Sequence, residues 1–169
     1  SFIISIMRKK IGISLRVVEA QNYAEKRDAL SHDWSKLFEN LDLLPILIPN
    51  NLENIEFFLN DLSLDGIVLS GGDNMGDNID RDKTEHFLLE YAIKKKIPTI
   101  GVCRGMQLIN NHFGGKLMTD SNEQHVAKDH EIQIIDTQFS TLFESNKVSV
   151  NSYHKNIIFQ ECLGNNLKP

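Results

Sequence analysis

A cysteine stands between two glycines in the segment "GVCRGMQLIN", residues 101–110. The apolar run before it predicts a buried strand, and residues 104–113 after it predict a helix. A thiol at a helix N-terminus is a candidate nucleophile, because free N–H groups and the helix dipole favour its thiolate form. Gly101 and Gly105 leave room for a sharp turn and for a substrate. We therefore expect Cys103 at a strand–nucleophile–helix turn with strained backbone.

A second glycine site ends the preceding predicted strand, in "IVLSGGDN" (67–74). The carboxyl ends of neighbouring parallel strands can lie side by side, so Gly71 and Gly72 are expected close to Cys103. The N–H groups of this turn and of Arg104 are then placed to hold an oxyanion. The alternative for Cys103 is a small core residue, and packing alone gives no reason for the diglycine turn.

The elements that position these residues alternate along the chain. Apolar runs at 10–15, 43–49, 65–72 and 97–102 predict strands, and helical spacing predicts helices at about 24–40, 51–61, 81–96 and 104–113. Continuously apolar strands between helices predict an α/β fold of three layers, α/β/α, with a mostly parallel sheet covered on both faces. Strands at 130–136 and 147–153, joined by loops, predict an antiparallel or mixed extension. A length of 169 residues fits a single domain.

Composition excludes several classes of partner. The net charge of −5 argues against a nucleic-acid or anionic-membrane partner, either of which favours a basic face. Two cysteines far apart in the chain form no disulfide framework and indicate a cytoplasmic protein. No segment reaches the roughly 18 apolar residues of a membrane span. His125 and His130 lack the cysteine or carboxylate spacing of a metal site, so neither metal nor cofactor is expected.

Five motifs in order resemble one family, the class I glutamine amidotransferase-like proteins, in their γ-glutamyl hydrolase branch, which includes the γ-glutamyl-γ-aminobutyrate hydrolase type. "GVCRGMQLIN" matches the signature G-x-C-x-G-x-Q of that family. The other four are "LSGGDN", the pair Arg81-Asp82 followed by Glu85, "GGKLMTD" and "VNSYHKNI". The resemblance extends over the whole chain from Lys10 onward.

The resemblance implies a flavodoxin-like fold and cysteine-dependent hydrolysis of a small-molecule γ-glutamyl amide through a γ-glutamyl thioester. The positions that it assigns are Cys103 as nucleophile, Gly72 and Arg104 as oxyanion hole, and Gly71, Gln107, Tyr153 and His154 as substrate contacts. The leaving amine has no signature in the sequence. Arg16, Tyr23 and Arg27, which follow the first predicted strand, are candidates to line an acceptor pocket.

The sequence departs from the family pattern at the catalytic base. The family takes its base and acid from a His-x-Glu pair near the C-terminus, and residues 1–169 contain no such pair. We therefore expect the chain to be the N-terminal part of a longer family member, and to be inactive alone. His154 is the candidate substitute, but its motif matches the substrate-side loop, and Glu161 lies too far along the chain to orient it.

Three functions stay open. The first is a stand-alone γ-glutamyl amide hydrolase. The second is a glutaminase subunit that delivers ammonia to a synthase partner. The third is a ligand-binding relic without turnover. A homo-oligomer is compatible with each of them.

Overall fold

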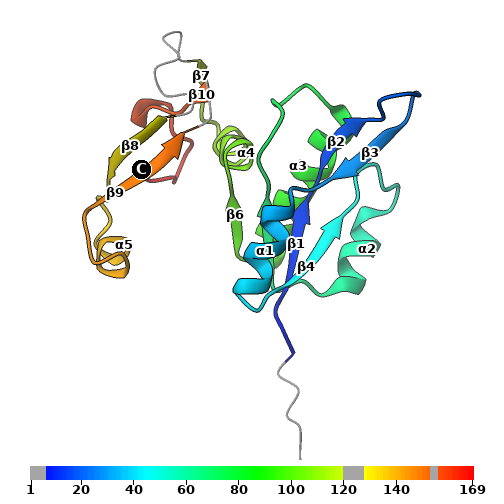
Figure 1. The fold of residues 1–169 in the computed structure, drawn as a ribbon, viewed down its shortest axis with the longest axis horizontal. Coiled ribbons are helices and arrows are strands. Elements are labelled where there is room, and N and C mark those ends of the chain that lie inside the picture. The colour runs from blue at the N-terminus through cyan, green and yellow to red at the C-terminus, as the bar shows by residue number, and fades with distance from the viewer. Residues whose placement is uncertain (1–6, 120–127, 153–155) are drawn as a thin grey trace, which may run out of the picture. The chain divides into compact units, whose positions relative to one another are not determined.

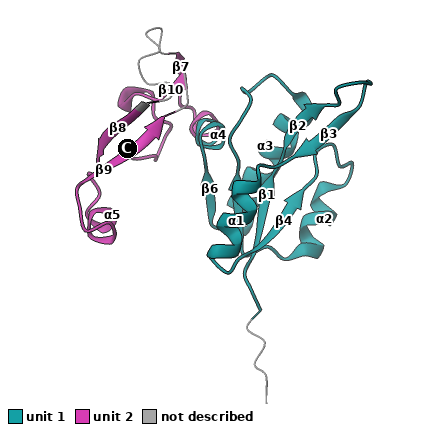
Figure 2. Ribbon diagram, viewed as in Figure 1, with its two compact units in different colours: residues 1–109 teal, residues 110–169 magenta. Residues whose placement is uncertain are grey.

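The computed structural model describes residues 7–119, 128–152 and 156–169. The chain divides into two compact units, residues 1–109 and 110–169 (Figure 2). A single domain over residues 1–169 stays a prediction, and the two units are described one at a time. No helix within the described ranges is long and apolar enough to cross a membrane.

The first unit is built on a four-stranded sheet in the order β4-β1-β5-β6, in which every pairing is parallel (Figure 1). Its strands are β1 (Lys10–Ser14), β4 (Leu44–Ile48), β5 (Gly66–Leu69) and β6 (Thr99–Gly101). Its helices are α1 (His32–Asn40), α2 (Ile55–Leu62) and α3 (Ile79–Lys95), followed by α4 (Arg104–His112), which continues across the unit boundary. The prediction of an α/β fold with a parallel sheet is confirmed.

Both faces of the sheet carry apolar side chains, because successive residues of a strand point to opposite faces. On one face Ile13 and Val68 pack with Phe38 of α1. On the other, Ile67 and Leu69 belong to a larger cluster with α2, α3 and α4. In α3, the side chains of Leu88, Leu89, Tyr91 and Ala92 are all buried. These two clusters give the three layers that the sequence predicts.

The predicted helix at 24–40 is wrong in its first half. Strand β3 (Lys26–Ala29) pairs antiparallel with β2 (Arg16–Glu19), so these residues form a hairpin. Helix α1 begins only after Ser31, whose hydroxyl accepts a hydrogen bond from the Asp33 N–H at 3.3 Å. The helical spacing of apolar residues starts at Leu30, and the polar segment before it satisfies its backbone groups across the hairpin instead.

The second unit contains two small antiparallel sheets. Strand β8 (Lys128–Gln133) pairs with β9 (Lys147–Ser152), and β7 (Met118–Thr119) pairs with β10 (Asn156–Ile157). The two predicted strands are therefore confirmed, but helix α5 (Thr137–Leu142) joins them in place of a loop. They pair with each other and do not extend the four-stranded sheet. A 3₁₀ turn, Gln160–Cys162, follows β10.

Asn110 organises the second unit from the last turns of α4. Its side-chain amide donates to the carbonyls of Lys116, at 3.2 Å, and of Cys162, at 3.1 Å. Its side-chain oxygen accepts from the Gly164 N–H at 2.8 Å. Cys162 is half-buried and its sulfur is free. These bonds tie segments that are far apart in the sequence to one buried amide.

The glycines with the least space around them lie where α4 begins. A Cβ on Gly105 would lie 2.1 Å from the Leu69 carbonyl oxygen, and one on Gly101 would lie 2.5 Å from the Gly105 carbonyl carbon. Both neighbours are backbone atoms, so a side chain at either glycine would push α4 away from β5 and β6. The glycines that flank Cys103 are therefore required by packing, in addition to any role in substrate access.

Gly105→Ala should lower the free energy of unfolding by about 3 kcal/mol, because the new methyl group overpacks the junction. Alanine is otherwise favoured over glycine in helices, so the sign of the effect reports the clash. Gly76→Ala is the control, since Gly76 has open space around it and φ of 93°. It should cost only about 1 kcal/mol, for the left-handed backbone. Urea denaturation of both variants measures the difference, and equal losses would contradict the packing at Gly105.

Candidate active site

Cys103 lies at the turn between β6 and α4, where the sequence places the nucleophile. Cys103 is an exposed, free cysteine, and its backbone φ is 51°. This left-handed conformation costs a non-glycine residue about 1–2 kcal/mol. Hydrogen bonds on both sides hold it, from Val102 N–H to the Leu69 carbonyl at 2.9 Å and from Gln107 N–H to the Cys103 carbonyl at 3.1 Å. The expected strained elbow is present.

The diglycine turn lies against this elbow. A Cβ on Gly71 would be 3.3 Å from the Cys103 Cβ, and Gly72 has φ of 91°, a conformation that favours glycine. The two turns meet because β5 and β6 are neighbours, with Leu69 opposite Gly101. The N–H groups of Gly72 and Arg104 form no hydrogen bond with another described residue. Two backbone donors without a partner among the described residues therefore lie in the two turns that meet at Cys103.

The buried side chain of Arg81, in α3, fixes the diglycine turn through hydrogen bonds to its backbone. Its buried guanidinium donates to the carbonyls of Ser70, at 3.1 Å, and Gly71, at 2.9 Å, and to the Ser70 hydroxyl, at 3.2 Å. The N–H and C=O of a trans peptide point in opposite directions. With the Gly71 carbonyl held by Arg81, the Gly72 N–H of the same peptide points away from Arg81. One side chain thus sets the direction of a candidate oxyanion donor.

Glu85 links this support to the helix that follows Cys103. One of its oxygens accepts from Arg81 Nε at 3.0 Å and from the Ser14 hydroxyl at 2.7 Å. The other oxygen pairs with the guanidinium of Arg104, which also pairs with Asp82. Glu85, Arg81 and Arg104 are all almost completely buried. The turn after β5, the end of β1 and the start of α4 are therefore joined through one carboxylate.

Asp73 extends the network toward solvent. It accepts from Arg16 at 2.8 Å and from Arg81 at 3.1 Å. Partial burial raises the pKa of the Asp73 carboxyl, but the Arg16 and Arg81 guanidiniums outweigh this effect and hold the pKa below its usual value. Burial lowers the pKa of Arg81 and of Arg104, and nearby carboxylates oppose the change. The three arginines are thus balanced by the carboxylates of Asp73, Asp82 and Glu85.

The other residues that the sequence assigns to the site differ in their placement. Gln107 lies one turn into α4 and is only 4% exposed. Tyr153 and His154 lie outside the described residues. Of the candidate acceptor residues, Arg27 donates to Tyr23 within the hairpin, whereas Arg16 lies over Gly72.

Sequence reasoning missed the supporting residues. It noted Arg81 and Glu85 as part of a family motif but assigned them no contact, and it gave Ser14 no role. The available signal was the four-residue spacing of Arg81 and Glu85, which places both on one side of a helix. Their pairing with Arg104 joins positions far apart in the chain, and no local pattern reports it.

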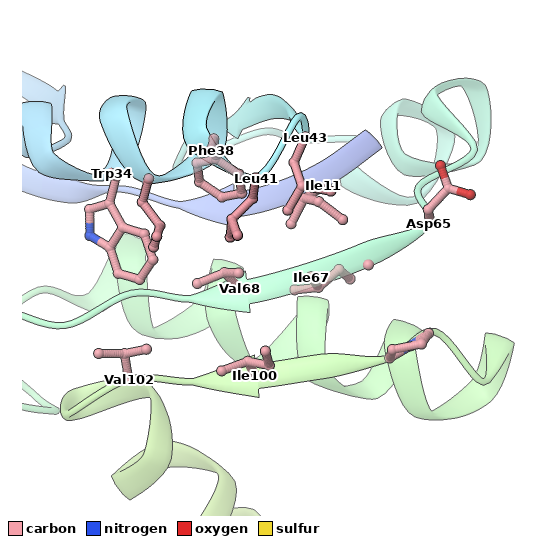
Figure 3. A pocket seen from close by; sticks show the side chains of 13 residues that line it. Ile11, Trp34, Phe38, Leu41, Leu43, Asp65, Ile67, Val68, Ile100 and Val102 are labelled. Atoms are coloured by element: carbon pink, nitrogen blue, oxygen red, sulfur yellow. The ribbon is translucent and has the colours of Figure 1, made fainter. Parts of the chain in front are cut away.

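One hollow of the first unit lies away from the diglycine turn. It is an apolar groove of about 340 Å³ along the face of the sheet that α1 covers in part (Figure 3). Helix α1 and its C-cap residue contribute Trp34, Leu37, Phe38 and Leu41. The strands contribute Ile67, Val68 and Ile100, and Val102 follows the end of β6. Asp65 is the one ionisable side chain among the described residues that line it. Substrate pockets need convergent polar groups, which the strand ends near Cys103 provide and this groove does not.

The groove also corrects an expectation about the sheet. Continuous apolar runs predict that both faces are covered, yet Ile100 of β6 is 64% exposed. Leu37 and Leu41, which follow the helical spacing of inward residues, are 46% and 58% exposed. Helix α1 therefore covers β1 and β5 on this face and leaves β6 open within the described part of the chain.

Glu85→Gln should lower the free energy of unfolding by about 3 kcal/mol, because it leaves two buried guanidiniums without their shared carboxylate. Glu90→Gln, an exposed position on the same helix, is the matched control and should change it by less than about 0.5 kcal/mol. Urea denaturation at neutral pH compares the two. Similar values would mean that the Glu85 ion pairs contribute no net stability.

Asp73 makes stability depend on acid pH. A carboxyl whose pKa is lower in the folded than in the unfolded chain stabilises the fold above its unfolded pKa, roughly 3.9. That contribution is lost as the pH falls through the folded pKa. Asp73→Asn should therefore lose stability at pH 7 and show a smaller further loss on moving from pH 5 to pH 3. Asp42→Asn, at a side chain 83% exposed, is the control. An unchanged acid slope in Asp73→Asn would contradict the assignment.

Several known proteins resemble this chain. Over 164 residues it is 34% identical to a gamma-glutamyl-CDP-amidate hydrolase of Campylobacter jejuni, covering 93% of this chain and 74% of that protein. The protein NtpR of Enterococcus hirae is 31% identical over 144 residues, covering 69% of this chain and 59% of NtpR.

Solved structures show the same fold. A glutamine amidotransferase from Thermotoga maritima superposes with a TM-score of 0.64 at 17% identity, over 90% of this chain and 63% of that one. A glutamine amidotransferase from Methylobacillus flagellatus has a TM-score of 0.59 at 13% identity, over 90% of this chain and 57% of that one. The chain thus spans less than two thirds of either structure.

The family model for Peptidase C26 matches residues 10–168, nearly the full length of the chain. The sequence motifs and the arrangement of the sheet agree with this match. The chain therefore belongs to the Peptidase C26 family, within the class I glutamine amidotransferase-like proteins.

Proposed function

We propose that the site cleaves γ-glutamyl amide bonds through a γ-glutamyl thioester on Cys103. One observation supports this above the others: an exposed cysteine at φ of 51° lies against a diglycine turn whose Gly72 N–H bonds to no other described residue. The hydrolase of Campylobacter jejuni, whose name specifies a γ-glutamyl amidate, supports the same reaction class. The substrate is a small molecule with a γ-glutamyl group and a leaving amine.

The reaction runs in two steps. The Cys103 thiolate attacks the γ-carbonyl carbon, and the oxyanion that forms accepts hydrogen bonds from the N–H groups of Gly72 and Arg104. The carbon–nitrogen bond then breaks, and the amine leaves with a proton. In the second step water attacks the thioester, releasing glutamate and restoring the thiol.

The amine needs a proton donor and the water needs a base. The family resemblance assigns both tasks to a His-x-Glu pair, which residues 1–169 do not contain. His154 is the alternative within this chain.

A glutaminase that supplies ammonia to a synthase is the second candidate. Over 92 residues the chain is 29% identical to the glutamine-hydrolysing GMP synthase of Dictyostelium discoideum. The match covers 51% of this chain and 12% of that protein. Glutamine turnover that rises on addition of a synthase would favour this function, and turnover independent of any partner would favour the stand-alone hydrolase.

Labelling and turnover test the proposal separately. Iodoacetamide and a diazoketone analogue of glutamine should both alkylate Cys103 in residues 1–169, with Cys162 reacting more slowly because it is half-buried. Hydrolysis of glutamine or γ-glutamyl amides should be negligible, since general acid–base catalysis contributes roughly 10²–10⁴ in rate. A chain that also carries a His-x-Glu segment should hydrolyse them. Peptide mapping by mass spectrometry and an ammonia assay give the two readouts.

Cys103→Ala and Cys162→Ser are the paired controls for this experiment. Alanine keeps the backbone and removes the thiol, so labelling by the diazoketone should vanish in the first and persist in the second. Preferential labelling of Cys162 would contradict the nucleophile. Robust turnover by residues 1–169 that His154→Ala abolishes would identify His154 as the base.

A further inference from the structure

We infer that Arg16 binds an anionic group of the substrate beside the oxyanion turn. The inference rests on the proposed function and concerns substrate recognition at that same site. Arg16 is the first residue of β2 and lies two residues after the buried end of β1, at the edge of the sheet where the strands β5 and β6 also end. Its side chain crosses the face of Gly72: an ideal Cβ on Gly72 would lie 2.5 Å from Arg16 Nε and 2.9 Å from its Cζ.

Arg16 differs from the other two arginines of the network in its exposure. Arg81 and Arg104 are buried and donate to carboxylates or to the backbone of the diglycine turn. The side chain of Arg16 is 50% exposed, and its Nη2 donates to Asp73 at 2.8 Å. A guanidinium has five N–H donors, and no other Arg16 donor is hydrogen-bonded within the described ranges. Arg16 therefore keeps donors for a ligand.

The carboxylate of Asp73 does not cancel this charge. Asp73 is shared, because its second oxygen accepts from Arg81 at 3.1 Å. It holds the Arg16 guanidinium in place and so reduces the side-chain entropy lost on binding. Arg16 is therefore a cation that Asp73 holds in position and partly neutralises, and its remaining N–H donors face solvent. It lies against Gly72, and the preceding residue, Gly71, contacts Cys103.

The chemistry of the proposed substrate supplies a matching group. A γ-glutamyl amide carries an α-carboxylate three carbons from the carbonyl that Cys103 attacks, and an amidate leaving group can carry phosphate on the other side. Guanidinium binds either of these through paired N–H groups. The shared ligand chemistry is a carboxylate or phosphate oxyanion, and the two sources can be separated by experiment.

The first arm of the test compares two diazoketone analogues of glutamine, one with the α-carboxylate and one with an α-carboxamide in its place. Iodoacetamide, which has no anionic group, reports the intrinsic reactivity of the thiol. Cys103 should react at least about tenfold faster with the carboxylate probe than with the carboxamide, which corresponds to about 1.4 kcal/mol. Arg16→Gln should abolish that preference while its iodoacetamide rate stays within about twofold of the original.

Lys26→Gln is the matched control, because it removes one positive charge from the paired strand of the same hairpin, at a side chain that is 59% exposed. It should keep the preference for the carboxylate probe. Arg16→Lys should keep part of it, since lysine retains the charge without the paired donors. A purely structural role of Arg16 would instead slow all three reagents together, because it would act through the position of Cys103 and Gly72.

The second arm tests the phosphate source. Cytidine diphosphate should protect Cys103 from iodoacetamide in the original chain and not in Arg16→Gln if the bound anion belongs to the leaving group. If Arg16→Gln alone loses the preference for the carboxylate probe, the inference is supported and the bound anion is the α-carboxylate. If it alone loses the protection by cytidine diphosphate, the inference is supported and the bound anion is a phosphate of the leaving group. If Arg16→Gln matches the original chain in both arms, or slows every reagent equally, Arg16 binds no substrate anion.

Failure of the proposed function has a different signature. In that case neither diazoketone labels Cys103 in the original chain, although iodoacetamide does, and the inference about Arg16 falls with it. When the diazoketones label the original chain and Arg16→Gln alike, the proposed function stands and only the inference is overturned.

Discussion

The geometry of the site depends on one buried carboxylate, that of Glu85. Two guanidiniums, a serine hydroxyl and three segments of the chain converge on it, and water is excluded from all of them. Burying such charges is expensive, and the mutual attraction repays that cost only while every partner is present. The network therefore has essentially one arrangement, and that arrangement sets where the diglycine turn and the start of α4 lie.

A second constraint acts through the backbone alone. Helix α4 begins so close to β5 that no side chain fits at Gly105, and Cys103 enters it in a left-handed conformation. Such strain persists only where the surrounding structure over-determines it. Here the ion pairs of Arg104 hold the helix start from one side, and the bond from Val102 to Leu69 holds the strand end from the other. Polar and steric constraints together keep the thiol exposed.

The sequence predicts the parallel sheet and the strand–helix turn at Cys103 because both follow from local sequence patterns. Buried parallel strands are continuous apolar runs, and the glycines around Cys103 mark a close backbone approach. The hairpin of β2 and β3 was not predicted, since "AEKRDA" is polar and favours helix by composition, and its pairing partners lie seven to thirteen positions earlier in the chain. The ion network was not predicted for a similar reason. Charged residues are usually solvated, and the residues around Arg81 and Arg104 in the sequence do not indicate that the two side chains lie close together. The open groove beside β6 reflects which elements cover the sheet, and no residue pattern encodes that.

The conformation of Cys103 also has a consequence for stability. At φ of 51° a glycine would sit without strain, whereas any other side chain costs about 1–2 kcal/mol. The exposed thiol and the stability of the fold are therefore in opposition at this residue. Relieving the strain through Cys103→Gly would also remove the sulfur, so a more stable turn and a turn that carries a thiol are alternatives at this position.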